Sequence, residues 1–459
     1  MSSRLTTEND RAIEELAERF RTVCESAVGP LEVASALEFD GVSDRVARVG
    51  YDVPDVFTLA RLLYVRVPRR PARPAAEHDP WQASRPLLHG LLYALPAACF
   101  PAAGALLVGR GVLPALVVAL LTGWGLSQGL AAVGYLRLGT SGAGQARHVL
   151  RAGLACCAVA VTVIMTVTTL AVHARPMILV FGAGEGVYML GACVLLVTGS
   201  ERWLSAALAP GVTGAVVFLV LGKPEELEYQ TWVALAATPV LACALAVACT
   251  AGAGPRLGRL LNRAELLGAL PAVAFGLLAG GLLSFPVVAG VSGHGGGNVG
   301  ALIASVPLAL SMGLAEWILV WYRRTTRRLL GLTDDPRWFR RRAGLLLLAA
   351  IARYVYGTVA LVCVAIDVAV LSGQVGVSLA MLLSATGYLL LGTAMFLVLL
   401  LMQVAGVRLV PLAALAATLG AELALRGDGL VVQIAAPSAL LAAVACYALA
   451  RLGKAVLHA

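Results

Sequence analysis

Charged side chains are scarce in this sequence of 459 residues, of which only 13% are Asp, Glu, Lys or Arg. About a quarter of the residues of an ordinary soluble domain are charged, whereas 59% of the residues here are hydrophobic. A water-soluble fold of this length has no means of hiding so much apolar surface. The composition therefore excludes a soluble globular protein and predicts an integral membrane protein whose main partners are membrane lipids.

Sequence motifs of enzymes and of metal sites are missing as well. Eight of the nine cysteines lie inside apolar runs without the spacing of metal ligands, and hydrolase and nucleotide-binding motifs are absent. Membrane glycan enzymes need acids or His on sizeable external loops, but the connections expected outside are very short and only 225–228 is acidic. We therefore expect no enzymatic activity, no metal and no cofactor.

The amino-terminal segment, residues 1–85, has no apolar h-region of a signal peptide. It mixes charges of both signs, and apolar residues such as Val56, Leu59 and Leu63 recur at helical spacing. The basic, proline-rich stretch 68–74 cannot form regular helix and is suited to anionic headgroups. We expect a small helical segment that stays in the cytoplasm, where it could hold a protein partner.

The rest of the chain consists of apolar runs of membrane-spanning length. A hydrocarbon core of about 30 Å needs roughly 20 apolar residues per helix, and twelve such runs follow one another. They lie near 87–108, 111–136, 148–172, 176–199, 202–222, 230–253, 266–290, 298–322, 343–371, 378–403, 408–425 and 430–452.

The basic residues predict how these runs are oriented. Alternate connections, counted with the carboxyl terminus, hold 18 Lys and Arg, whereas the opposite set holds 4. The excess places both termini in the cytoplasm of a multi-pass protein of the cell inner (plasma) membrane. It also accounts for the net charge of +9, so we expect no nucleic-acid partner.

Three short segments of the first six runs recur in the same order in the second six, which indicates an internal repeat. Because six runs separate the copies, the halves would cross the membrane in the same direction, as parallel lobes related by an axis along the membrane normal. We expect an all-α fold with six-helix lobes at 87–253 and 266–455. The matches pair 91–100 with 266–275 at seven of ten positions, 126–131 with 310–315 at five of six, and 151–154 with 342–345 at all four.

The repeat aligns Pro96 of the first run with Pro271 of the seventh. A proline inside a helix removes a backbone hydrogen bond and bends the helix. We expect these two bends to shape the helices that gate a central cavity, although a bend with no role in gating explains the pattern equally well.

This architecture resembles that of the multidrug/oligosaccharidyl-lipid/polysaccharide exporter superfamily, and within it the polysaccharide or lipid-linked oligosaccharide flippases. The resemblance covers 87–455 and implies export of an anionic or glycan substrate by alternating access. The major facilitator superfamily shares the parallel duplication, but its signature loop carries an acid, and 134–151 has none. A major-facilitator exporter of small molecules, a membrane-embedded glycan enzyme and a non-transporting scaffold remain as alternatives.

Ionisable residues inside the runs are the candidates for function, because a charge in hydrocarbon is costly. Glu185 and Arg353 lie nine to ten residues into their runs, near the bilayer centre. We expect both to face a central cavity, with Arg353 anchoring a phosphate or carboxylate and Glu185 as its counter-ion or as a protonatable coupling site. A buried structural ion pair is the alternative.

Neighbouring residues complete the candidate site. Tyr354 and Tyr356 could stack on a sugar, although tyrosines in a helix bundle also serve in packing. Glu316 is a candidate gate residue, whereas we expect Glu422 to pair with Arg426 at helical spacing. The basic stretch 323–342 either reports topology or recruits an anionic lipid-linked substrate.

Overall fold

The computed structural model describes residues 2–27, 29–68, 88, 91–92, 95–107, 112–252, 262–291, 298–330, 336–371, 378–425 and 430–452. Helix is the only regular secondary structure over these residues, as the sequence predicts. The chain divides into two compact units, of which one contains residues 1–82 and the other contains the membrane-length helices.

The amino-terminal unit is a set of short helices around a small core of its own. Pro30 occupies the first turn of α3, where its missing N–H is not needed. At the start of α5, the backbone N–H of Thr58 donates to the carboxylate of Asp55 at 2.7 Å. Val56, Leu59 and Leu63 are fully buried, so the predicted stripe does face a core. The helices are α1 (Ser2–Arg19), α2 (Arg21–Ser26), α3 (Pro30–Phe39), α4 (Asp44–Tyr51) and α5 (Val56–Arg66).

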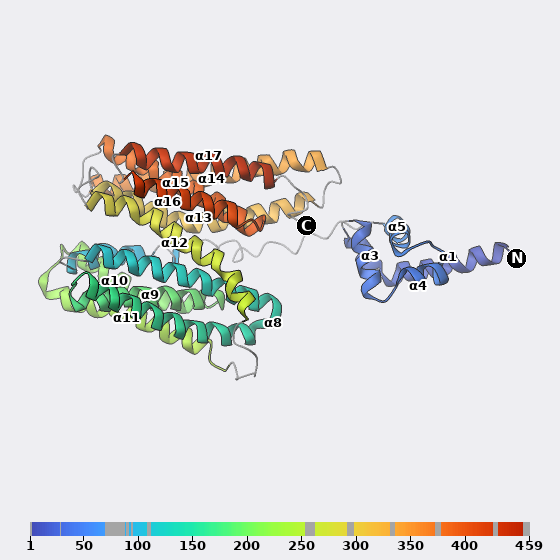
Figure 1. Cartoon of the computed structure of the whole chain (residues 1–459), viewed down its shortest axis with the longest axis horizontal. Coiled ribbons are helices and arrows are strands. Elements are labelled where there is room, and N and C mark those ends of the chain that lie inside the picture. Colours follow the sequence, from blue (N-terminus) through green and yellow to red (C-terminus); the bar gives the residue numbers. More distant parts are fainter. Residues whose placement is uncertain are drawn as a thin grey trace. The chain divides into compact units, whose positions relative to one another are not determined.

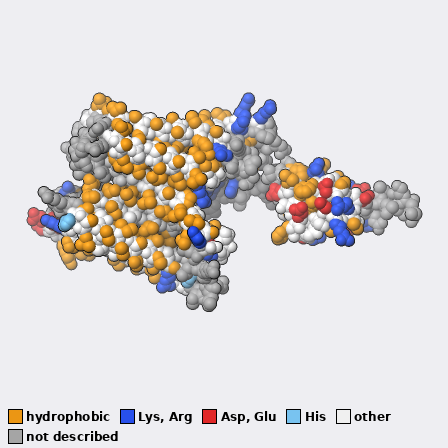
Figure 2. Space-filling view, viewed as in Figure 1, with side chains coloured by type: hydrophobic (Ala, Val, Ile, Leu, Met, Phe, Trp, Pro, Cys, Tyr) orange, Lys and Arg blue, Asp and Glu red, His pale blue; other side chains and the backbone are white. Residues whose placement is uncertain are grey.

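Each of the twelve predicted apolar runs coincides with helix, and eight of the described helices are long and apolar enough to cross a membrane. The helices are η1 (Leu95–Ala98), α7 (Cys99–Leu106), α8 (Val112–Ala171), α9 (Pro176–Val197), α10 (Glu201–Val220), α11 (Glu228–Cys249), α12 (Arg263–Val291), α13 (Asn298–Leu330), α14 (Pro336–Leu371), α15 (Leu379–Val404), α16 (Leu409–Ala424) and α17 (Leu430–Leu452). Figure 2 shows the apolar surface of this unit.

Helix α8 differs from the sequence expectation, because it contains both the second and the third run. The connection expected near 137–147 is helical except at Gly142, whose φ of 83° and ψ of 172° break the path. A residue with a side chain rarely adopts that φ. The predicted turn is therefore a single glycine between two helices.

The membrane-length helices form two groups with separate cores (Figure 1). The first helix group, η1 and α7 to α11, buries residues such as Leu150, Met165 and Phe218. The second helix group, α12 to α17, buries residues such as Tyr322 and Phe396. That the groups are parallel repeats stays a prediction.

The two groups meet where α8 approaches α12. A Cβ added at Gly276 of α12 would lie 2.9 Å from the Cα of Gly125 and 3.0 Å from the carbonyl oxygen of Trp124. Only glycine allows two backbones to come this close. At one end of the same contact, Arg137 forms an ion pair with Glu265 at 2.8 Å.

Candidate functional site

Glu185 lies on α9, and a different side of this helix packs closely against α8. Cβ atoms added at Gly182 and Gly186 would come within 2.4 Å of Met165 and 2.5 Å of Val161 on α8. These glycines therefore let α9 press against α8, which agrees with a packing role for the glycines of this helix. Glu185 is one residue away from Gly186 and so points to a different side.

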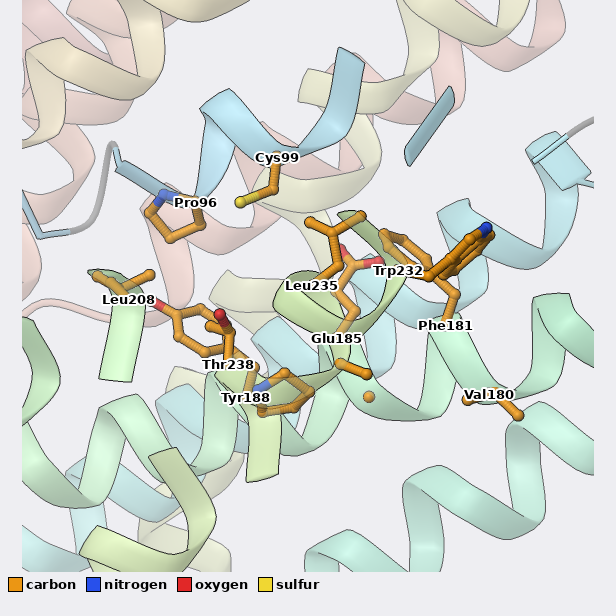
Figure 3. A pocket seen from close by; sticks show the side chains of 13 residues that line it. Pro96, Cys99, Val180, Phe181, Glu185, Tyr188, Leu208, Trp232, Leu235 and Thr238 are labelled. Atoms are coloured by element: carbon orange, nitrogen blue, oxygen red, sulfur yellow. The ribbon is translucent and has the colours of Figure 1, made fainter. Parts of the chain in front are cut away.

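The carboxyl group of Glu185 lines a cavity of about 100 Å³ inside the first helix group. Figure 3 shows its walls, to which η1, α7, α9, α10 and α11 contribute. Glu185 is the only lining residue with an ionisable carboxyl. The lining residues are Pro96, Cys99, Val180, Phe181, Gly184, Glu185, Tyr188, Leu208, Trp232, Leu235, Ala236, Thr238 and Pro239.

Both carboxyl oxygens of Glu185 are buried, and neither has a hydrogen-bond partner among the described residues. The hydroxyl of Thr238, on the same wall, is already engaged, because it accepts from the N–H of Gly211 at 3.1 Å. An ionised carboxylate without a partner is costly in such surroundings. The pocket is therefore suited to hold a neutral carboxyl, or a carboxylate with a cation beside it.

The structure does not bring Arg353 and Glu185 together. Arg353 is on α14, in the second helix group, and does not line the Glu185 pocket. Its side chain is exposed, and its guanidinium carbon lies 3.8 Å from the ring centroid of Trp321. The expectation of one cavity shared by both charges thus has no counterpart in this arrangement of the helices, and the substrate-anchor role of Arg353 stays a prediction.

The two tyrosines beside Arg353 have opposite environments. Tyr354 is 2% exposed, its hydroxyl is 2.8 Å from that of Ser311, and its ring stacks on Phe396 with centroids 4.9 Å apart. Tyr356 is 80% exposed. The contacts of Tyr354 are those of a packing residue, whereas Tyr356 is accessible from outside the bundle.

The three predicted gating residues lie on different elements. Pro96 is in η1 and lines the Glu185 pocket, so a break in regular α-helix occurs where the proline bend was expected. Pro271 is half-buried within α12, which continues through it. Glu316 is half-buried on α13 and has a contact partner. Their roles in gating stay predictions.

A second buried carboxyl is that of Glu422, which was named from the sequence only as a partner of Arg426. Glu422 of α16 is 2% exposed and lines a space of about 10 Å³ with Ser384, Tyr388 and Gln433. Its Oε2 atom has no hydrogen-bond partner among the described residues. Arg426, its expected partner, is outside the described residues. The sequence feature that indicates a buried carboxyl here is an acidic residue within an otherwise apolar run.

The other residues around Glu185 were also missed. Phe181 and Tyr188 are four residues before and three residues after Glu185, so they share its face of α9, and this spacing could have identified them. Trp232, which contacts Phe181 edge to face with ring centroids 6.4 Å apart, comes from α11 and has no such signal. No cluster of three or more His, Cys, Asp or Glu side chains suited to a metal occurs in the described ranges.

Comparison with known proteins identifies solved structures only, since no family model and no curated protein matches the chain. A crystal structure of MATE in the bent conformation is 14% identical with a TM-score of 0.47, and one of MATE in complex with MaD3S is 16% identical with a TM-score of 0.48. Each alignment covers 82% of this chain and 96% of the other. At these values the likeness does not by itself assign a function.

Proposed function

We propose that this chain is a membrane exporter that works by alternating access, and that Glu185 couples export to the movement of a proton or another small cation. The observation that carries the proposal is the carboxyl of Glu185, which lines an apolar pocket and has no hydrogen-bond partner among the described residues. Such a group gains stability by taking up a proton or a cation, and loses it on release. Coupling of export to an ion requires a group that takes up and releases a proton or a cation in this way.

The walls of the pocket suggest how uptake could be linked to helix movement. They come from five helical elements, and η1 is a short 3-10 segment that contains Pro96. A helix interrupted at a proline can change its bend without breaking further hydrogen bonds. Occupation of the pocket would thus favour one position of this segment over another.

The substrate is a separate part of the proposal. The sequence favours a polysaccharide or lipid-linked oligosaccharide, and the arginines of 323–342 could recruit its phosphate groups. The geometry gives this less support than it gives to export as such, because Tyr354 is engaged in packing. A small amphipathic cation is the second candidate, since the pocket combines aromatic walls with one carboxyl.

Transport into inside-out vesicles tests these statements. Vesicles containing the protein should accumulate either ethidium or a fluorescent lipid-linked oligosaccharide when an ion gradient is applied, and empty vesicles should not. E185Q should abolish the accumulation, whereas E225Q, on the connection before α11, should retain it. The exporter proposal is overturned if neither probe is moved, and the coupling role is overturned if E185Q transports at the wild-type rate.

A further inference from the structure

Arg353 is a charged residue on a membrane-length helix, and no anionic side chain contacts it among the residues that the structure describes. Among the described residues it has no hydrogen bond and no ion pair, and the contact that holds it is the face of Trp321. An aromatic face fixes the position of a guanidinium without neutralising its charge. Since an unpaired charge in hydrocarbon is costly, an exposed arginine here needs an anion from outside the protein.

The depth of the guanidinium follows from the pairing of α13 with α14. Only five residues join the end of α13 to the start of α14, so the two helices run antiparallel. The Ser311–Tyr354 contact and the approach of Leu314 to Gly357 show that they pack side by side. With a rise of 1.5 Å per residue, these two contacts place the backbone of Arg353 roughly 5–14 Å farther from the arginine-rich end of α13 than that of Trp321. Because the guanidinium nevertheless touches the Trp321 ring, the Arg353 side chain must extend toward that end.

The end to which it extends is basic and is predicted to be cytoplasmic. Arg323 and Arg324 follow Trp321 after one residue, and the side chain of Arg324 is exposed. Clusters of arginine at this level attract anionic headgroups. The side chain of Arg353 is therefore directed toward the leaflet where anionic headgroups gather.

The surface beside Arg353 is shaped for acyl chains. Leu345 is 58% exposed, Leu348 52% and Val364 60%, and together with Tyr356 they form an uncovered apolar stripe along α14. An exposed stripe of this kind on a membrane-length helix faces lipid tails. A charged group and an apolar stripe thus adjoin on one face of the bundle.

We propose that Arg353 and Trp321 form a binding site for the phosphate group of an anionic phospholipid from the leaflet at the arginine-rich end of α13. The planar guanidinium, fixed on the indole ring, presents its N–H donors to two phosphate oxygens, while the acyl chains lie along the α14 stripe. The lipid supplies the missing anion and is held at the edge of the second helix group. The site does not depend on which substrate the chain exports.

Lipid binding by the purified full-length protein tests the site. Native mass spectrometry counts retained phosphatidylglycerol, and thermal unfolding compares phosphatidylglycerol with phosphatidylcholine of the same chains. We expect the wild type to retain phosphatidylglycerol and to unfold at higher temperature with it than with phosphatidylcholine, by mass action. R353Q should bind phosphatidylglycerol at least about tenfold more weakly, and R353K should fall between the two.

The matched control is R202Q, because the guanidinium of Arg202 also lies on a tryptophan, 5.4 Å from the ring centroid of Trp203, but on α10. R202Q should keep the wild-type difference between the two lipids. Since the difference is taken within each variant, a general loss of stability in R353Q does not imitate loss of the site.

Four results would overturn the proposal, and the last two concern the source of the phosphate. One is an equal response of R353Q and the wild type to phosphatidylglycerol, and another is an equal response of the wild type to both lipids. If glycerol phosphate alone reproduced the shift, the ligand would be a soluble phosphate, and if a polyprenyl phosphate bound tenfold better than phosphatidylglycerol, it would be a lipid-linked substrate.

Discussion

Glu185 and Glu422 are both buried acids on membrane-length helices, one in each helix group, yet their surroundings differ. Glu185 lines a cavity of about 100 Å³ with nearly apolar walls, whereas Glu422 lines about 10 Å³ beside Ser384, Tyr388 and Gln433. The larger space can admit a cation, and the neighbouring side chains do little to stabilise the Glu185 carboxyl. The smaller one holds at most about one water. The difference in surroundings therefore supports exchange at Glu185 and a structural role at Glu422.

The largest expected difference between Glu185 and Glu422 is the effect of their replacement on the rate of transport. E185Q keeps the volume of the side chain but cannot take up or release a proton, so export should fall to the level of empty vesicles. E422Q should retain most of the wild-type rate, because an amide can make the same kind of polar contacts. Equal loss in both variants, at matched amounts of inserted protein, would contradict the distinction.

The contact between the helix groups should be the most sensitive position for stability. G276A places a methyl group 2.9 Å from the backbone of Gly125, and such overpacking costs about 1–3 kcal/mol. G268A is the matched control on the same helix, because nothing lies within 4 Å of its added Cβ. Tryptophan fluorescence during thermal unfolding should show a lower midpoint for G276A alone. A normal midpoint would mean that α8 and α12 can separate slightly without cost.

Apolar replacements should distinguish the two acids by the direction of the stability change. E185L removes a buried carboxyl without partners among the described residues, so the free energy of unfolding should rise by about 1 kcal/mol. E422L should instead lower it, because the polar groups of Ser384, Tyr388 and Gln433 would face a leucine. Unfolding midpoints of both variants in one detergent provide the test, and a decrease for E185L would indicate that a water or ion occupies its pocket.

Asp55 of the amino-terminal unit has a hydrogen-bond partner, and its replacement should have the smallest effect of these changes. The backbone N–H of Thr58 donates to Asp55 and lowers the pKa of that carboxyl from its usual value. Its stabilisation is therefore present above the unfolded pKa of about 3.9 and disappears as pH falls through the lower folded pKa. D55A should reduce the helical circular dichroism of α5 slightly near pH 7, and the difference from the wild type should vanish in acid. D55N, which can still cap the helix, is the control.

The sequence predicted the positions of the helices better than it predicted which helices contact one another. Runs of about 20 apolar residues form helices because every backbone group must be satisfied within the segment in a membrane. The connection predicted near 137–147 is where Gly142 breaks the helix, but it is much shorter than expected, which shows how little irregular backbone a turn requires. Glu185 was identified because a charge in hydrocarbon is conspicuous, but its pocket was not, since half of the walls come from α10 and α11.

Composition, apolar run length and the distribution of charge by themselves determined that this protein is all-helical and crosses the membrane many times. Only the tertiary structure decided that Glu185 and Arg353 lie apart, that Arg353 rests on Trp321, and that Glu422 lies in a small polar space. The reason is physical. A helix in a membrane is apolar on all sides, so its sequence does not reveal which face meets lipid and which meets another helix, and that choice depends on packing between segments far apart in the chain.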